Sequence, residues 1–150
     1  MEEAARKAIA NVSEDETVKL AGELIKIPSF SGNETGVARM LAGFLKGERI
    51  DTELQEIEKG RFQTIGRIKG RSGGQTLMFN GHLDVDLVTL AQKRDPWKPT
   101  VEGDLLYGHG VGNMKAGVAS FVMAAAALKR IGFKPRGDII IAAVDGELQG

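Results

Sequence analysis

The sequence contains no cysteine, and it is poor in histidine and in aromatic residues. Among 150 residues there are two His, one Trp and one Tyr. The absence of Cys excludes disulfide bonds, Cys-ligated zinc sites and thiol catalysis. Lys and Arg together number 20, as do Asp and Glu, so the formal net charge is zero. This balance gives no electrostatic basis for binding nucleic acid or an anionic membrane, because both require a basic face.

Long apolar runs are also missing. No run approaches the roughly 20 residues of a membrane span, and the first twelve residues hold no apolar stretch of signal-peptide length. We therefore expect no membrane partner and a cytoplasmic location by default. Apolar residues still make up 42% of the chain, which is enough for a core at a length typical of one domain. Glycine, with 20 residues, is at about twice its average usage and indicates tight turns or close backbone approach.

Two helices are predicted before residue 50. Ser13 and Glu16 form a capping box, and Pro28 ends the helix that follows. That helix carries on one face Leu20, Leu24 and Ile27. A second capping box, Ser31–Glu34, precedes a helix that ends near Gly47. Its apolar stripe consists of Val37, Leu41, Phe44 and Leu45.

Strand patterns follow from Ile50. Residues 50–55 alternate between apolar and polar side chains, which predicts a half-buried strand. Phe62–Ile68 is predicted to be its neighbour across a turn near Lys59 and Gly60. Leu77–Phe79 is a short continuous apolar run, typical of a strand buried on both faces.

The C-terminal third predicts a helix followed by a buried strand. After a largely irregular stretch at 83–112, a helix is expected from about Met114 to Ile131, ended by Gly132. Its core face consists of Val118, Phe121, Val122, Ala125 and Leu128. Ile139–Val144 is an unbroken apolar run and is the most convincing buried strand. A helix followed by such a strand is the pattern of an α/β sheet.

Three polar clusters lie just after predicted strands or at the start of a helix. They are Gly81–Asp84, Gly108–Asn113 and Asp145–Glu147. In open α/β sheets, ligands collect beyond the carboxyl ends of the strands. The polar residues in these clusters are therefore stronger candidates for function than polar residues elsewhere in the chain.

Two of these clusters contain residue types that bind metals. His82 and Asp84 are two residues apart and project to the same side if the backbone is extended. A carboxylate commonly orients a metal-binding imidazole, so this spacing suits one ligand and its support. Glu147 is a candidate metal ligand or general base. Spacing alone leaves open a histidine satisfied within a loop and a solvated Glu.

The glycine-rich loop before Met114 fails as a phosphate-binding motif. Asn113 stands where G-x-G-x-x-G requires its last glycine, and no G-K-[ST] sequence occurs. An unrelated nucleotide-binding module is therefore the least favoured alternative. Lys115 is predicted to pair with nearby carboxylates rather than with phosphate.

Taken in order, five motifs resemble the N-terminal part of an M20-type metallohydrolase. This family includes acetylornithine deacetylase, succinyl-diaminopimelate desuccinylase, aminoacylase and carboxypeptidase G2. The likeness runs from about residue 14 to the end. The motifs are I-P-S-F-S-G-N-E at 27–34, G-H-L-D-V at 81–85, D-P-W at 95–97, L-Y-G-H-G-V-G-N-M-K-A-G at 106–117 and D-G-E at 145–147.

The resemblance implies a zinc-exopeptidase-like catalytic domain with a mixed, largely parallel sheet flanked by helices. Because family members are more than twice this long, residues 1–150 are expected to be the incomplete N-terminal part of that domain. The lid or dimerisation domain and the C-terminal part of the catalytic domain would be absent. A homodimer is then expected only for the full-length parent. We expect the isolated chain to be inactive and poorly soluble, because strand edges and the Met114–Ile131 helix face would be exposed.

The resemblance also implies hydrolysis of amide bonds in N-acyl amino acids or small peptides, with a divalent metal. Zinc is usual, cobalt and manganese are alternatives, and the choice between one and two ions stays open. His82 resembles the first metal ligand, and Asp84 resembles the carboxylate that orients it and is counted as catalytic. Glu147 matches a metal-ligand Glu and is also a candidate base. Asn113 stands where the family has a metal-bridging Asp, and is a weaker ligand.

Two departures from the family pattern favour an alternative function. Asn113 offers a neutral oxygen where a carboxylate would offer two anionic ones. Gly146 occupies the position of the general-base Glu and cannot move a proton, and loss of a positioned base costs about 10²–10⁴ in rate. The alternative is a non-catalytic relative that binds a small carboxylate ligand or a partner. His109 replaces a common Arg and is expected to have a local role.

Overall fold

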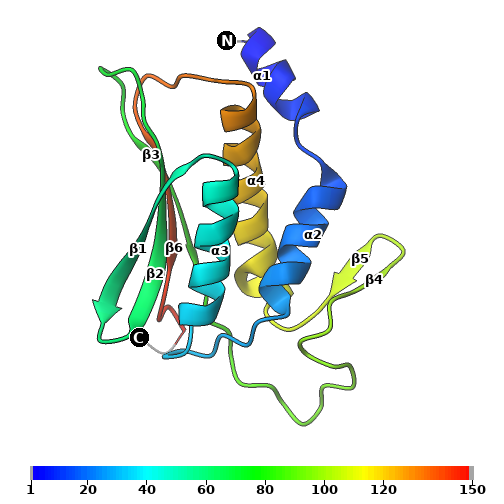
Figure 1. The fold of residues 1–150 in the computed structure, drawn as a ribbon. Coiled ribbons are helices and arrows are strands. Elements are labelled where there is room, and N and C mark those ends of the chain that lie inside the picture. Colours follow the sequence, from blue (N-terminus) through cyan, green and yellow to red (C-terminus); the bar gives the residue numbers. More distant parts are fainter. Residues whose placement is uncertain (1, 149–150) are drawn as a thin grey trace.

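The chain folds as helices packed on one face of a four-stranded sheet, with a separate short hairpin (Figure 1). The computed structural model describes residues 2–148. A kinked turn at Val111–Lys115, in which Asn113 and Met114 have non-helical φ and ψ angles, leads directly into the last helix. The elements, in chain order, are α1 Glu2–Ala10, α2 Glu14–Ile25, α3 Thr35–Gly47, β1 Asp51–Glu58, β2 Arg61–Ile68, β3 Leu77–His82, β4 Thr100–Glu102, β5 Leu105–Tyr107, α4 Ala116–Arg130 and β6 Ile139–Val144.

The sheet is mixed, as predicted, but it is not largely parallel. Its strand order is β1-β2-β6-β3. Within the described residues, β1 pairs antiparallel with β2 and β2 pairs antiparallel with β6, and only β3 and β6 are parallel. The β1–β2 pair is antiparallel because a tight turn joins them, and there Gly60 has a φ of +79°. The single parallel pair places the carboxyl ends of β3 and β6 at the same edge.

The first predicted capping box is confirmed in its Ser13 half only, because the carboxylate of Glu16 pairs with Arg130. The Oγ atom of Ser13 accepts a hydrogen bond from the backbone N–H of Glu16 at 3.2 Å, and α2 begins at Glu14. The helix ends at Ile25, before Pro28, as expected. Leu20 and Leu24 are buried on its inner face.

The second predicted capping box is wrong. α3 begins at Thr35, and no side chain caps it. Ser31 instead donates its hydroxyl to Asp84, at 2.8 Å. Glu34 accepts hydrogen bonds from the backbone N–H of Gly32 and from Arg61. Hydrogen bonds to charged partners are stronger than neutral ones, so these contacts outcompete a local cap.

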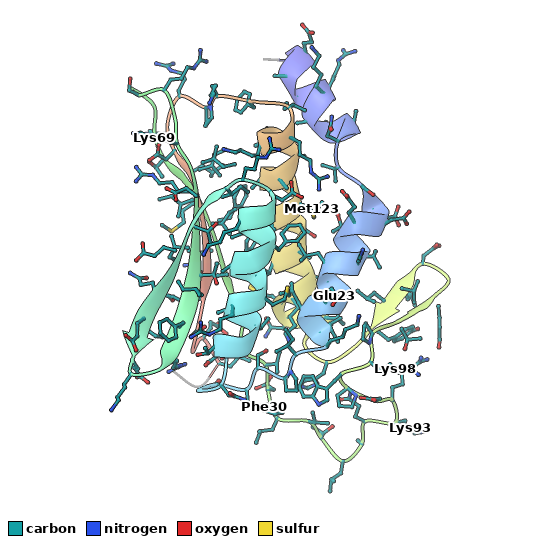
Figure 2. All side chains as sticks on the ribbon, viewed as in Figure 1. Glu23, Phe30, Lys69, Lys93, Lys98 and Met123 are labelled. Atoms are coloured by element: carbon teal, nitrogen blue, oxygen red, sulfur yellow. The ribbon has the colours of Figure 1, made fainter. Side chains whose placement is uncertain are left out.

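The core lies between the sheet and the helices. β6 is central, and Ile139, Ile141 and Ala143 are buried in it. On α4, the buried face includes Val118, Ala119, Val122, Met123 and Ala125; Figure 2 labels Met123 on this helix. The expectation that this helix face would be exposed is therefore wrong.

By length and composition, one helical segment among the described residues, Val111–Arg130, qualifies as a membrane span. The segment is not an unbroken apolar run, because Asn113, Lys115 and Ser120 interrupt it. Its apolar character has another cause in this fold, because α4 packs against α2, β3 and β6. The segment is apolar as a core helix is.

The prediction that Leu77–Phe79 is buried on both faces is also wrong. Leu77 and Met78 are 53% and 54% exposed. The reason is that β3 is the edge strand of the sheet in the described residues. Only its C-terminal end, at Gly81 and His82, is buried.

Candidate functional site

The polar clusters at His82–Asp84 and Asp145–Glu147 meet because their strands are parallel neighbours. In the β3–β6 register, His82 lies opposite Val144, so both strands end at the same level. The residues that follow them therefore share one edge of the sheet. Gly81 allows β3 to lie close to α4, since a Cβ atom there would lie 2.8 Å from the Phe121 ring.

His82 contacts all three of the other predicted site residues. Its side chain is 5% exposed. Nδ1 lies 2.9 Å from the carbonyl oxygen of Asp84 and 3.3 Å from Oδ1 of the same residue. Nε2 lies 2.9 Å from Oδ1 of Asn113 and 3.7 Å from Oε2 of Glu147. The structure thus brings His82, Asp84, Asn113 and Glu147 together.

The imidazole faces acceptor oxygens at both ring nitrogens: two oxygens of Asp84 at Nδ1, and Oδ1 of Asn113 with Oε2 of Glu147 at Nε2. In the tautomer with the proton on Nδ1, that nitrogen donates to Asp84 and Nε2 presents a lone pair. That lone pair faces the amide of Asn113 and the carboxylate of Glu147. In the absence of a cation, the amide nitrogen of Asn113 can donate to it after a half-turn of the side chain. With Oδ1 of Asn113 facing His82, the site presents three electron-pair donors: Nε2 of His82 and the oxygens of Asn113 and Glu147. A divalent cation requires donors of this kind.

Asp84 links the two loops of the site. Its side chain is fully buried. Oδ1 accepts the N–H of Glu147 at 3.2 Å, and Oδ2 accepts the N–H of Leu148 at 2.9 Å and the hydroxyl of Ser31 at 2.8 Å. Burial raises the pKa of Asp84, but hydrogen bonds from Leu148, Ser31 and Glu147 more than offset this, and the net pKa is lowered. Asp84 is therefore a carboxylate at neutral pH.

Asp145 is a buried carboxyl group for which the sequence indicated no role. Within the described residues, neither of its oxygens has a hydrogen-bond partner. The nearest cation is Arg61, whose Nε lies 3.8 Å from Oδ2 and also donates to Glu34 at 3.0 Å. Burial, with the neighbouring charges of Glu34 and Asp84, raises the pKa of Asp145 to about 7 against the opposing effect of Arg61.

Lys115 does not pair with carboxylates, contrary to the prediction. Its fully buried ammonium donates to the carbonyl oxygens of Leu24 at 2.7 Å and Ile27 at 2.9 Å. These carbonyls lie at the C-terminal end of α2, where a cation is favoured. Lys115 therefore ties the turn that carries Asn113 to the end of α2. Burial lowers its pKa to about 8.

The loop at 108–113, with Asn113 at its end, borders a cavity of about 510 Å³. His109 makes local contacts there: Nε2 lies 2.7 Å from the carbonyl oxygen of Asp86, and the ring meets Trp97 edge-on. Two lysines of the cavity wall lie on the long loop between β3 and β4 (Figure 2). The charged and polar lining includes Asp86, Lys93, Arg94, Asp95, Lys98 and Asn113.

The donor set suits one side of a metal site. Across residues 2–148, no group of three or more His, Asp or Glu side chains is arranged to hold a metal ion. Nε2 of His82 nevertheless lies 2.9 Å from an oxygen of Asn113 and 3.7 Å from an oxygen of Glu147, so one nitrogen and two oxygens lie close together. Imidazole nitrogen and carboxylate oxygen are ordinary zinc ligands. The residues present therefore fit a divalent cation that further ligands would complete.

The fold and the site together define a class of α/β protein. In this class a histidine, an amide and a carboxylate lie beyond the carboxyl ends of two parallel strands. A family model described as Peptidase family M20/M25/M40 matches residues 78–150. Residues 78–150 therefore match the M20 peptidase family.

The curated relatives that this chain matches are longer than it is. It is 29% identical over 143 residues to the N-formyl-4-amino-5-aminomethyl-2-methylpyrimidine deformylase of Bacillus subtilis, covering 91% of this chain and 34% of the relative. It is 34% identical over 110 residues to the succinyl-diaminopimelate desuccinylase of Gluconobacter oxydans, covering 73% and 29%. The chain therefore spans about a third of the length of the curated relatives it matches.

Solved structures share the fold. A tripeptidase from Staphylococcus aureus superimposes with a TM-score of 0.74 at 23% identity, covering 93% of this chain and 38% of that protein. A dinuclear metal-binding peptidase of the M20 family from Bacillus subtilis gives a TM-score of 0.64 at 20% identity, covering 89% and 35%.

Proposed function

We propose that this chain is the N-terminal part of the catalytic domain of a metal-dependent hydrolase that cleaves amide bonds in N-acyl amino acids or small peptides. The observation that carries the proposal is the meeting of His82 and Glu147, 65 positions apart in sequence, with 3.7 Å between Nε2 and Oε2. The family match and the activities named for the relatives support the reaction class.

A divalent cation at this point would polarise the amide carbonyl and lower the pKa of water so that hydroxide is available at neutral pH. His82 and Glu147 would hold the cation, and zinc is the ion that this donor pair suits best. Asn113 would add a neutral oxygen. A second ion would need ligands from outside this chain.

The other residues act on the ligands. The backbone carbonyl of Asp84 fixes the tautomer of His82, and its carboxylate holds the backbone at Glu147. Gly146 has no side chain to act as a base, and its φ of +74° is a backbone conformation that other residues rarely adopt. The Glu147 side chain is 58% exposed, so its carboxylate can also reach and accept a proton from a substrate-side water.

The cavity beside Asn113 offers a place for part of a substrate. It has both lysine and aspartate side chains in its wall, which suits the charged ends of an amino acid or short peptide. A lid or dimerisation domain and the remaining ligands would lie in a longer parent, as would any homodimer interface.

Metal binding by the full-length parent tests the proposal, because residues 1–150 hold only part of the ligand set. We expect Co²⁺ to bind and to give a visible absorption spectrum that the His82→Ala and Glu147→Ala variants lose. His109→Ala is the matched control, because it removes the other histidine of residues 1–150 and should leave binding unchanged. Absence of Co²⁺ and Zn²⁺ binding, or equal binding by the His82→Ala variant, would refute the proposed metal site.

The full-length parent provides the test of activity. Loaded with zinc, cobalt or manganese, it should cleave members of a panel of N-acyl amino acids and dipeptides. Failure on the whole panel would contradict the reaction class.

A non-catalytic relative is the second candidate function. Asn113 and Gly146 favour it, because they remove a bridging anion and a base from otherwise intact motifs. Such a protein would keep the fold to bind a small carboxylate ligand or a partner. Metal content of the purified full-length protein separates the two candidates, since stoichiometric metal counts strongly against this one.

A further inference from the structure

We infer that Ser31 is a positioning residue for the two candidate metal ligands, acting through the carboxylate of Asp84. The inference rests on the proposed function in one respect, that His82 and Glu147 are the ligands. The contact that carries it is the 2.8 Å hydrogen bond from the Ser31 hydroxyl to Oδ2 of Asp84, which joins residues 53 positions apart.

The backbone around Ser31 is held beside the backbone around Asp84. Ser29 donates its hydroxyl to the carbonyl oxygen of Leu83 and accepts the N–H of Val85 at its own carbonyl, both at 2.8 Å. Phe30 and Val85 form a parallel β-bridge. Because these contacts flank Ser31 and Asp84, the hydroxyl approaches the carboxylate in a defined geometry.

The Ser31 hydroxyl has no competing local role. It does not cap α3, which begins at Thr35 without a side-chain cap. A serine hydroxyl has one hydrogen to donate, and here Asp84 accepts it.

The Asp84 carboxylate transmits the effect to both ligands. Oδ1 accepts the N–H of Glu147 and lies 3.3 Å from Nδ1 of His82. Oδ2 accepts the N–H of Leu148 as well as the Ser31 hydroxyl. Without Ser31, Oδ2 would keep only the Leu148 N–H, and the carboxylate could rotate about its bond to Cβ. Rotation would loosen the backbone at Glu147 and the orientation of His82 together.

Three variants test this inference, first in the 150-residue chain and then in the full-length parent. Ser31→Ala removes the hydroxyl, and Ser31→Thr keeps one and serves as the rescue. Ser120→Ala is the control, because the Ser120 hydroxyl bonds only locally to the carbonyl oxygen of Ala116 on α4 and is exposed.

The first measurement needs no metal. In the metal-free chain, we expect the Ser31→Ala variant to exchange the amide hydrogens of Glu147 and Leu148 about tenfold faster, while the Ile141 amide is unchanged. Nitrogen NMR should also show a mixture of His82 tautomers in place of the Nδ1–H form. The Ser31→Thr and Ser120→Ala variants should match the wild type. The inference is overturned if the exchange rates at Glu147 and Leu148 are unchanged in the Ser31→Ala variant. It is also overturned if they rise only by the same factor as the exchange rate at Ile141.

The second measurement is the Co²⁺ affinity of the full-length parent. Removal of an outer partner of a metal ligand weakens binding by about 10–100-fold, and we expect the lower end for Ser31→Ala because it acts through Asp84. If the wild type binds no Co²⁺ but the exchange effect is present, the proposed function fails and the positioning role of Ser31 stands. If the wild type binds Co²⁺ and Ser31→Ala binds it equally well with unchanged exchange, the inference alone fails.

Discussion

Burial of the Lys115 ammonium predicts an unusual dependence of stability on alkaline pH. Burial lowers the pKa of Lys115 from 10.5 to about 8 in the folded chain. The unfolded chain therefore binds more protons than the folded chain between these two values, and the free energy of unfolding should rise with pH across that window. Below about pH 8, both states are protonated and the full cost of burying the charge is present.

The size of this effect follows from the shift. A difference of about 2.5 pKa units corresponds to about 3 kcal/mol at 1.36 kcal/mol per unit. The hydrogen bonds to the carbonyls of Leu24 and Ile27 reduce the cost of the charge, so this figure is an upper bound. We expect a gain of about 1–3 kcal/mol in unfolding free energy between pH 8 and pH 10.5.

Urea denaturation at several pH values checks the prediction. The Lys115→Met variant should lose the rise in unfolding free energy with pH, because it lacks the titrating group. Its stability at pH 7 can differ from that of the wild type for a separate reason, since two buried carbonyls lose their donor. Lys98→Met is the matched control, since Lys98 is exposed and should leave the rise intact. Equal pH dependence in the wild type and the Lys115→Met variant would refute the reasoning.

Three further predictions concern the site and the sheet edge. Asp84→Asn should lower the unfolding free energy by about 3 kcal/mol at pH 7, because charged hydrogen bonds to Ser31 and to two backbone N–H groups are lost. In the wild type, this contribution to stability should disappear as the pH falls through the lowered pKa of Asp84. Equal urea midpoints for the variant and the wild type at pH 7 would contradict the prediction. Gly146→Glu should not restore a base without cost: at a φ of +74° a side chain costs about 1–2 kcal/mol, so a variant that melts at or above the wild-type temperature would count against this view of the turn. The isolated chain should self-associate through β3, and Met78→Lys should reduce this in analytical ultracentrifugation; a monodisperse wild-type monomer with a cooperative melt would show the edge to be harmless.

Local structure was readable wherever a short pattern decides it. The cap at Ser13, the hairpin around Gly60 and the central strand at Ile139–Val144 all follow from neighbouring residues and hydrophobic period. Patterns failed where a distant partner competed. Ser31 and Glu34 have the spacing of a capping box, but Asp84 and Arg61 take their side chains.

The site likewise contains residues that the sequence predicted and residues that it did not. The residue types and the order of the motifs predicted His82, Asp84, Asn113 and Glu147 as one group, and their side chains do meet. Ser31 lies in the motif at 27–34, but its local spacing pointed to a helix cap and its contact with Asp84 was not predicted. Asp145 stood in a recognised cluster, yet its isolation from hydrogen-bond donors depends on burial, which spacing does not reveal.

The linear order of residues by itself determined the helices, the strands and the family resemblance, because each depends on periodicity or on motifs that are local in the chain. Only the tertiary structure decided which strand lies at the sheet edge, which carbonyls receive Lys115 and which hydroxyl reaches Asp84. The physical reason is that burial and hydrogen bonding between distant segments depend on how strands pair in space. In this chain, the parallel pairing of β3 with β6 is the step that turns two separate motifs into one site.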